Sequence, residues 1–131
     1  MPRRSGLSDR QDPARGTRFE MQTIRLAEAR PYEAPKHFDV LSLRLQSQEI
    51  SGSEFCTVGL STYSPGGRAD MDAGAQEKIY LVLSGEIQVT LETGEVTRLH
   101  QYDSCRLAPG ERRAVHNATS VEAKLLVIMP V

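Results

Sequence analysis

Short apolar runs separated by turn-forming residues make up most of the chain after residue 20. The runs are rich in Val, Ile, Leu, Thr and Tyr, the separators are Gly, Pro, Asn, Asp and Ser, and no helical periodicity extends over three turns. This pattern predicts about nine β-strands, at 23–27, 38–46, 55–64, 78–84, 86–92, 95–100, 103–108, 112–117 and 123–130. The expected fold class is all-β, either a sandwich or a jelly-roll barrel.

The run 38–46 alternates Leu41, Leu43 and Leu45 with Val40, Ser42 and Arg44, which predicts a half-buried strand with one face in the core. The run 78–84 is apolar at nearly every position. We expect both of its faces to be covered, one by the barrel interior and the other by another chain or by the N-terminal strands. "LETGEV" predicts a hairpin loop, and Pro109-Gly110 a tight turn before the next strand.

Residues 1–20 differ in composition from the rest of the chain. They combine charged residues with Gly, Pro and Ser and contain almost no large apolar side chain before Phe19. Such a segment buries too little apolar surface to offset the entropy cost of ordering it. We therefore expect a disordered N-terminal arm at 1–20 and a single β-barrel domain at 21–131.

Length and charge limit the classes of function. A chain of 131 residues fits one domain, and 16 Lys and Arg against 17 Asp and Glu provide no basic excess for nucleic acid. No apolar run is long enough to span a membrane, and the N-terminus lacks a secretory apolar region. Cys56 and Cys105 form no CxxC pair and are expected to be free thiols. We expect a cytoplasmic protein with neither nucleic acid nor membrane as a partner.

Two motifs resemble those of the cupin superfamily, small β-barrels of the jelly-roll type. "PGGRADMDAGAQEKIYLVLSGE", residues 65–86, has the spacing of the first cupin motif, with Gly85 as its second glycine. "APGERRAVHN", residues 108–117, resembles the second motif, and Asn117 completes it. The resemblance covers residues 21–131 and implies a single jelly-roll barrel that has its site inside.

The resemblance also implies positions for four metal ligands, and this chain departs from the pattern at all of them. Asp72 and Gly74 occupy the two histidine positions of the first motif, Lys78 its last ligand position, and Arg113 the histidine position of the second motif. Ammonium and guanidinium groups repel a divalent cation. We therefore expect neither a metal nor another cofactor.

Displaced ligands are the alternative to a metal-free pocket. Strand alternation turns His116 away from the face that carries Arg113, and His37 and His100 lie at strand ends where surface positions are expected. Asp70 and Asp72 form a D-x-D pair in a region without further ligands. A relocated metal site therefore stays an alternative hypothesis. Under it, the protein would be a metal-dependent dioxygenase or isomerase with unusual ligands.

Alternation along 78–84 places Lys78, Tyr80 and Val82 on the inner face, where they meet the inner residues of 112–117, namely Arg113, Val115 and Asn117. An ammonium, a guanidinium, a phenol and an amide form a donor-rich site for a carboxylate, enolate or phenolate. We therefore expect a small organic anion as ligand, with Tyr80, Asn117, Val115 and Val82 lining its site. Structural ion pairs of Lys78 or Arg113 with Asp72 or Glu111 are the competing interpretation.

Proton transfer is the chemistry that such a site favours. A lysine next to an arginine in a half-dry barrel is expected to have a lowered pKa, which suits a general base, while Arg113 stabilises an oxyanion. Asp72 is an alternative base. Lys78, Arg113 and Asp72 are thus the candidate catalytic residues for isomerisation, cyclisation, dehydration or decarboxylation of a small carbonyl acid. A binding or sensing module without turnover fits the same residues.

The distribution of apolar residues also suggests self-association. The strand 79–83 is apolar on both faces, and the C-terminal "LLVIMPV" would be costly to expose to water. Known cupins often pair in the same way. The sequence therefore predicts a homodimer.

Overall fold

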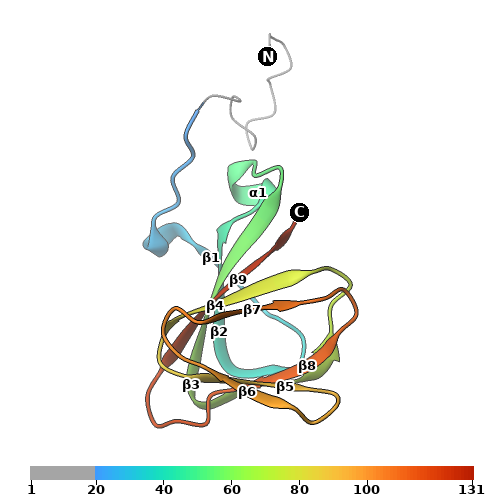
Figure 1. Ribbon diagram of the computed structural model, residues 1–131. Helices are drawn as coiled ribbons and strands as arrows, with labels where there is room; N and C mark the ends of the chain where they lie inside the picture. Colours follow the sequence, from blue (N-terminus) through green and yellow to red (C-terminus); the bar gives the residue numbers. More distant parts are fainter. Residues whose placement is uncertain (1–19) are drawn as a thin grey trace.

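The computed structural model describes residues 20–131, and nearly all of its regular structure is β (Figure 1). The strands are β1 Arg30–Tyr32, β2 His37–Gln46, β3 Cys56–Ala73, β4 Lys78–Ser84, β5 Ile87–Leu91, β6 Val96–Leu99, β7 Ser104–Leu107, β8 Arg112–His116 and β9 Ala123–Pro130. A 3-10 helix, η1 Leu26–Glu28, precedes β1, and a one-turn helix, α1 Gln48–Ser51, follows β2. The all-β prediction is confirmed. The predicted arm falls almost entirely on residues 1–19, which lie outside the described residues.

Eight of the nine predicted strands correspond to observed strands, and the first does not. The segment 23–27 is not a strand, and its end forms η1, which carries a capping hydrogen bond from the Arg25 amide to the Glu28 carboxylate at 3.0 Å. The N-terminal strand is β1, which begins at Arg30. The apolar residues of 23–27 suggested a strand. The prediction is wrong, because this short segment pairs with no neighbouring strand.

The long strand β3 connects the two layers of the barrel. Its first part pairs with β2 on one side and β9 on the other, and its last part pairs with β8. The sheet runs in the order β6-β5-β8-β3-β9-β4-β7, and all of its pairings are antiparallel. The layer with β4 and β7 therefore faces the layer with β5, β6 and β8 across the core, as Figure 1 shows. This is the expected jelly-roll architecture.

Strand β2 is half-buried, but its leucines lie on the outside. Ser42 is buried and Val40 packs against the core, whereas Leu41 is 54% exposed. Ser42 pairs with Ser61 of β3, and their hydroxyls lie 3.4 Å apart inside the barrel. The prediction of one core face is therefore confirmed, and the outward face of β2 adds leucines to the surface of the sheet.

Two glycines of the first motif allow backbone segments to approach closely. A Cβ on Gly67 would lie 2.5 Å from the Asp39 carbonyl oxygen, so β2 and β3 can meet there only through a glycine. Gly85 has φ of 77°, and a Cβ there would lie 2.8 Å from the Glu122 carbonyl oxygen. Both positions fix the path of the chain around the barrel.

Candidate functional site

Arg113 is a buried cation in the barrel wall. It lies on β8, is 6% exposed, and its Nε donates a 2.8 Å hydrogen bond to the phenol oxygen of Tyr80 on β4. Its Nη1 approaches the Asp72 carbonyl oxygen at 3.4 Å. Among residues 20–131 no carboxylate lies within ion-pair distance of this guanidinium. A buried charge with only neutral partners is costly, which makes the position attractive to an anion.

Lys78 lies beside Arg113, and Gly74 makes room for its head. A Cβ on Gly74 would lie 2.9 Å from the Lys78 Nζ, so the ammonium packs over the glycine backbone. The pKa of Lys78 is lowered, first by burial and then by the charge of Arg113, while Asp72 opposes the shift. The lowered pKa expected from the sequence is therefore found, and the ammonium loses its proton more readily than in water.

Asp72 lies at the end of β3, opposite Arg113 in the strand register. Its carboxylate accepts a hydrogen bond from the Ala73 amide at 2.9 Å and lies 3.9 Å from the Lys36 Nζ. These two partners lower the pKa of Asp72, with the hydrogen bond as the larger cause. The carboxylate is thus at the rim, paired with Lys36 instead of forming an ion pair with Lys78 or Arg113 among the described residues.

His37, which the sequence places at the surface, is half-buried at the rim of the same site. It opens β2 opposite Ala69, an inward-facing residue of β3. Its pKa is lowered, chiefly by burial and further by the charges of Arg113 and Lys78. The Nδ1 atom lies 2.8 Å from the Pro35 carbonyl oxygen. Because a carbonyl only accepts, Nδ1 carries the proton and the Nε2 of the neutral ring keeps its lone pair.

Sequence analysis missed His37 because it placed the residue just before the predicted strand 38–46, whereas β2 begins at His37 and has an irregularity next to it. The register shifts between Phe38 and Val40, where Asp39 adopts φ of 58°. Simple alternation from Val40 and Ser42 turns His37 outward, but one extra residue reverses the parity and turns it inward. No signal in the sequence identifies this bulge except the polar residue, Asp39, at a position that needs positive φ.

Buried phenols adjoin the cationic residues. Tyr80 is 3% exposed and Tyr63 is 2% exposed. Burial raises the pKa of both phenols, and the charge of Arg113 opposes the rise in each case. Tyr32 reaches the same interior, because its hydroxyl lies 3.2 Å from the position of a Cβ on Gly59. Tyr80 is therefore a neutral hydrogen-bonding group, with its oxygen already held by Arg113.

The other predicted ligand-binding residues are enclosed in the fold. Val82 and Val115 belong to the apolar core and are 0% and 1% exposed. Asn117 Nδ2 donates to the carbonyl oxygens of Tyr63, Ser64 and Val121, and its Oδ1 accepts from the amide and hydroxyl of Thr119. The Asn117 side chain therefore has no hydrogen-bonding capacity left for a ligand, and its role is to fasten a loop to β3.

The residues at the metal-ligand positions of the motif do not fit a divalent ion. They supply one carboxylate, that of Asp72, which is held by Lys36 and Ala73, together with two cations and a glycine. Within residues 20–131 no group of three or more His, Cys, Asp and Glu is arranged to hold a metal. Lys78 and Arg113 instead supply positive charge where the motif would hold a cation.

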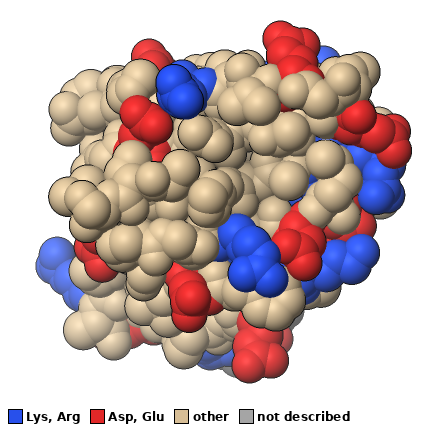
Figure 2. All heavy atoms as spheres, turned by 90° about the horizontal axis from the view of Figure 1, so that it is seen from below, with Lys and Arg blue, Asp and Glu red and all other residues tan. Residues whose placement is uncertain are grey.

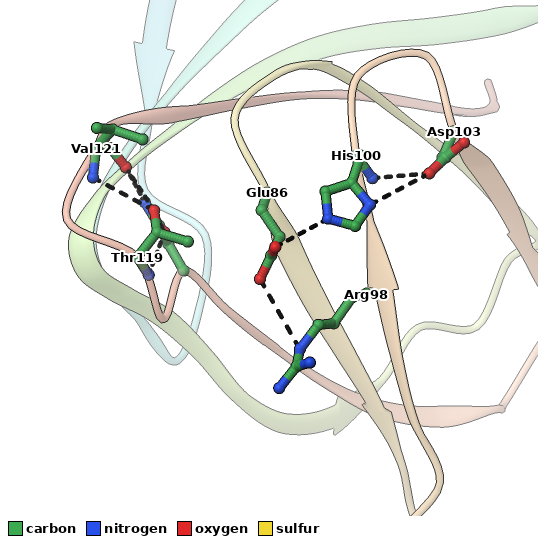
Figure 3. Close-up of polar contacts among 7 residues, drawn as sticks. Glu86, Arg98, His100, Asp103, Thr119 and Val121 are labelled. Atoms are coloured by element: carbon green, nitrogen blue, oxygen red, sulfur yellow. Dashed lines mark hydrogen bonds and ion pairs between the residues drawn. The ribbon is translucent and has the colours of Figure 1, made fainter.

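A second polar cluster lies at another end of the barrel. His100 Nε2 contacts the Glu86 carboxylate at 2.9 Å, and Asp103 accepts a hydrogen bond from the His100 amide, also at 2.9 Å (Figure 3). Arg98 approaches the other Glu86 oxygen at 3.9 Å. Most of these side chains are exposed, as expected for His100, and His116 is exposed as well. The cluster fastens the β4–β5 turn to the loop after β6.

The face of the molecule drawn in Figure 2 has no concentrated patch of one charge. On the face in Figure 2, acidic and basic side chains lie interspersed around a largely uncharged area. Cys56 and Cys105 are free and half-buried, as expected. No helix among residues 20–131 has the length and apolar character needed to cross a bilayer. The feature that stands out for function is therefore the cluster of buried Arg113 with the partly buried Lys78 and His37.

Comparison with known proteins agrees with this architecture and identifies the family. The family model described as "Cupin domain" matches residues 59–129, which contain both motifs. The chain belongs to the cupin family. It is 44% identical over 107 residues to a protein of Mycobacterium tuberculosis (strain ATCC 25618 / H37Rv) named beta-D-galactosidase, a match that covers 82% of this chain and 91% of that protein.

Solved structures show the same fold at low sequence identity. The polyketide cyclase RemF from Streptomyces resistomycificus matches with a TM-score of 0.76 and 16% identity, over 85% of this chain and 80% of that one. A predicted oxalate decarboxylase from Thermotoga maritima matches with a TM-score of 0.68 and 18% identity, over 84% of this chain and 99% of that one. At these identities the likeness extends to the barrel and not to its chemistry.

Proposed function

We propose that this cupin binds a small organic anion, a carboxylate or an enolate, inside its barrel through Arg113 and Lys78. The observation that carries the proposal is the buried Arg113 guanidinium, which has a phenol and a carbonyl oxygen as hydrogen-bond partners. Its Nη2 and Nη1 edge can form the paired hydrogen bonds that suit a carboxylate. Lys78 adds a second positive charge next to it.

A proton-transfer reaction on the bound anion is the extension of this proposal. His37 offers a neutral imidazole with its Nε2 lone pair, and its lowered pKa keeps it in that form at neutral pH. In the proposed step Nε2 takes a proton from the carbon next to a carbonyl, and the charge that develops on the enolate oxygen is stabilised by Arg113 and Lys78. Such a step begins isomerisations, cyclisations and dehydrations alike. Lys78 and Asp72 remain alternative bases.

Binding is tested with a panel of small carboxylates, including acetate, pyruvate, 2-oxobutyrate and benzoate, by isothermal titration calorimetry. We expect Arg113→Met to lose about 2–4 kcal/mol of binding free energy, roughly a 30- to 1000-fold loss of affinity, because a paired charge is removed. Arg112→Met is the matched control, since Arg112 lies on the same strand but points outward to Glu92. Equal binding by both variants, or no binding by the wild type, contradicts the proposal.

Catalysis is tested separately from binding by hydrogen exchange. In D₂O, the α-protons of a bound 2-oxo acid would exchange for deuterium faster than in buffer, as followed by NMR. We expect His37→Gln to slow this exchange at least tenfold while the ligand still binds, because only the base is lost. Exchange that equals the buffer rate in the wild type would leave a binding or sensing module without turnover.

Hydrolysis of a β-D-galactoside is a second candidate, supported by the identity to the mycobacterial protein of that name. Glycoside hydrolysis commonly uses two carboxyl groups. Asp72 and Glu111 are candidates, because the Gly110 amide donates a 2.8 Å hydrogen bond to the Gly74 carbonyl and so joins their two segments. Both groups lie at the rim, whereas the buried end of the site is cationic.

The second candidate is tested with o-nitrophenyl β-D-galactoside. If it holds, the wild type releases o-nitrophenol, and Asp72→Asn and Glu111→Gln each slow the release at least a hundredfold. Glu95→Gln in the exposed β5–β6 hairpin serves as the control and keeps the wild-type rate. Release at the rate of the buffer blank, with carboxylate binding intact, excludes this candidate and leaves the first.

A further inference from the structure

An apolar cavity of about 100 Å³ lies in the seam between β6 and β7, the two strands at the ends of the sheet order. Its apolar lining comes from Val89, Leu91, Leu99 and Leu107, and Thr97, Cys105, Arg106 and Glu111 complete the wall. Val89, Leu99 and Leu107 also belong to the barrel core, so the cavity lies against the inner faces of their strands. The Cys105 thiol is held protonated there, because burial and the Glu111 charge raise its pKa. The cavity wall is therefore unreactive and mostly apolar.

Strand register brings this cavity next to the cationic cluster. Leu107 is the cross-strand partner of Lys78, Cys105 is the partner of Tyr80, and Leu91 is the partner of Arg113. Directly opposed residues point to the same face of a sheet and have Cβ atoms about 5 Å apart. Three residues of the cavity wall are thus immediate neighbours of the three residues that hold the proposed anion site, and one ligand can contact both.

We propose that this cavity is the apolar subsite of the anion site, and that the ligand is a small carboxylate with a short alkyl or compact ring substituent. The inference rests on the proposed anion site. Arg113 and Lys78 supply positive charge at one end, whereas Leu91, Leu99 and Leu107 make the cavity wall mostly apolar, so the carboxylate group is directed toward Arg113 and the apolar substituent into the cavity.

The size and polarity of the cavity limit which substituents it can hold. A dry apolar cavity of about 150 Å³ holds benzene in another protein, so the 100 Å³ found in this barrel corresponds to a group of about three or four carbons. Hydroxyl groups placed against Val89, Leu91 and Leu99 would lose their hydrogen bonds to water and find few replacements. The subsite therefore selects an amphipathic acid over a polyhydroxylated ligand such as a sugar.

The experiment is a calorimetric titration of the full chain with acetate, propionate, butyrate, valerate and hexanoate. We expect the affinity to rise about fourfold with each added methylene group, and to stop rising once about four carbons fill the cavity. Thr97→Tyr, at the exposed mouth of the cavity, should remove the dependence on chain length. Cys105→Phe fills the cavity from β7 and should act in the same way.

Val96→Tyr is the matched control, because Val96 is the exposed neighbour of Thr97 on the opposite face of β6. This variant should keep the full dependence on chain length. Equal affinity for all five acids, or a dependence that survives both cavity-filling variants, overturns the subsite while the anion site stands. If none of the acids binds, or if Arg113→Met binds them as the wild type does, the proposed anion site itself fails.

Discussion

At the scale of single residues, Arg113 is the side chain whose surroundings call for a functional explanation. A buried guanidinium in a protein interior usually has a carboxylate partner, because the cost of removing the charge from water is large. Here Asp72, an acidic partner considered from the sequence, accepts a hydrogen bond from Arg113 only through its backbone oxygen. Its carboxylate pairs with Lys36 instead. The positive charge thus remains available to a ligand.

This arrangement predicts an unusual stability pattern. Arg113→Met should leave the free energy of unfolding unchanged or raise it by about 1–2 kcal/mol, because an uncompensated buried charge is replaced by apolar volume. Tyr80→Phe should cost about 1–3 kcal/mol, because the Arg113 Nε loses its buried acceptor. Urea unfolding measures both. A loss above about 3 kcal/mol in Arg113→Met would assign the guanidinium a structural role instead.

The titration of His37 provides a second prediction at this scale. Its pKa should lie below the ordinary value of 6.5, and Lys78→Met or Arg113→Met should raise it, because each removes a repelling positive charge. Asp72→Asn should lower it further, because a stabilising negative charge is lost. NMR titration of the imidazole measures all four proteins. Identical midpoints would show that His37 does not share a site with these groups.

The same shift sets the direction of a pH effect on stability. Because the folded pKa of His37 is lowered, the unfolded chain binds more protons than the folded chain between the two pKa values. Stability should therefore rise with pH through the window below 6.5, and His37→Gln should reduce that rise. Denaturant midpoints measured across this window in both proteins test the sign, and a steeper rise in the variant would contradict it.

At the scale of secondary-structure elements, regular strands were predictable from the sequence, and their irregularities were not. Alternation correctly places Lys78, Tyr80 and Val82 on the inner face of β4, and Arg113 and Val115 on that of β8. It does not place His37, which lies before the predicted strand and next to the bulge at Asp39, and it does not tell which face of β2 meets the interior. Local periodicity records neither a register shift nor which face meets the barrel interior.

Hydrogen-bond partners from distant segments were also beyond sequence reasoning. The sequence motif located Asn117. The hydrogen bonds from its side-chain amide to the carbonyl oxygens of Tyr63, Ser64 and Val121, however, depend on how β3 bends. The rim pairing of Asp72 with Lys36 likewise joins the end of β3 to the turn before β2. Such contacts follow from the fold and not from spacing.

Gly74 offers an element-level prediction about how the loop after β3 shapes the site. Its backbone does not require a positive φ, so Gly74→Ala should fold, but the new Cβ would lie 2.9 Å from the Lys78 Nζ. The flexible lysine head should move away, and carboxylate affinity should fall about three- to tenfold, in keeping with the loss of a partly exposed charge contact. Unchanged affinity in Gly74→Ala would remove Lys78 from the site.

At the scale of the whole molecule, the outer face of the β2-β3-β9-β4 layer is apolar. Leu43, Leu60, Leu126 and Leu81 are consecutive cross-strand partners across it, and Val58, Ile128 and Ile79 form a second such row. Several remain partly accessible to solvent, and Ile79 is 36% exposed. Continuous apolar surface of this kind is typical of interfaces between protein chains. We infer that two copies of the chain pair through this layer.

The dimer is tested by multi-angle light scattering. Leu126→Lys and Leu81→Lys should each yield a monomer, because a charge at the centre of the apolar rows would be buried without a partner. Thr90→Lys, on the outer face of β5 in the opposite layer, should leave the dimer intact. A monomeric wild type, or dimers in both leucine variants, would contradict this interface.

The most direct measurement of the central claim follows the Arg113 Nε–H resonance by NMR while butyrate is added. The account predicts a resolved, slowly exchanging signal, held by the Tyr80 phenol oxygen, that shifts and saturates with the same dissociation constant as calorimetry gives. The signal should be missing in Arg113→Met, which should no longer bind butyrate. An Arg113 signal that stays unchanged while butyrate saturates the protein would place the anion elsewhere and contradict the account.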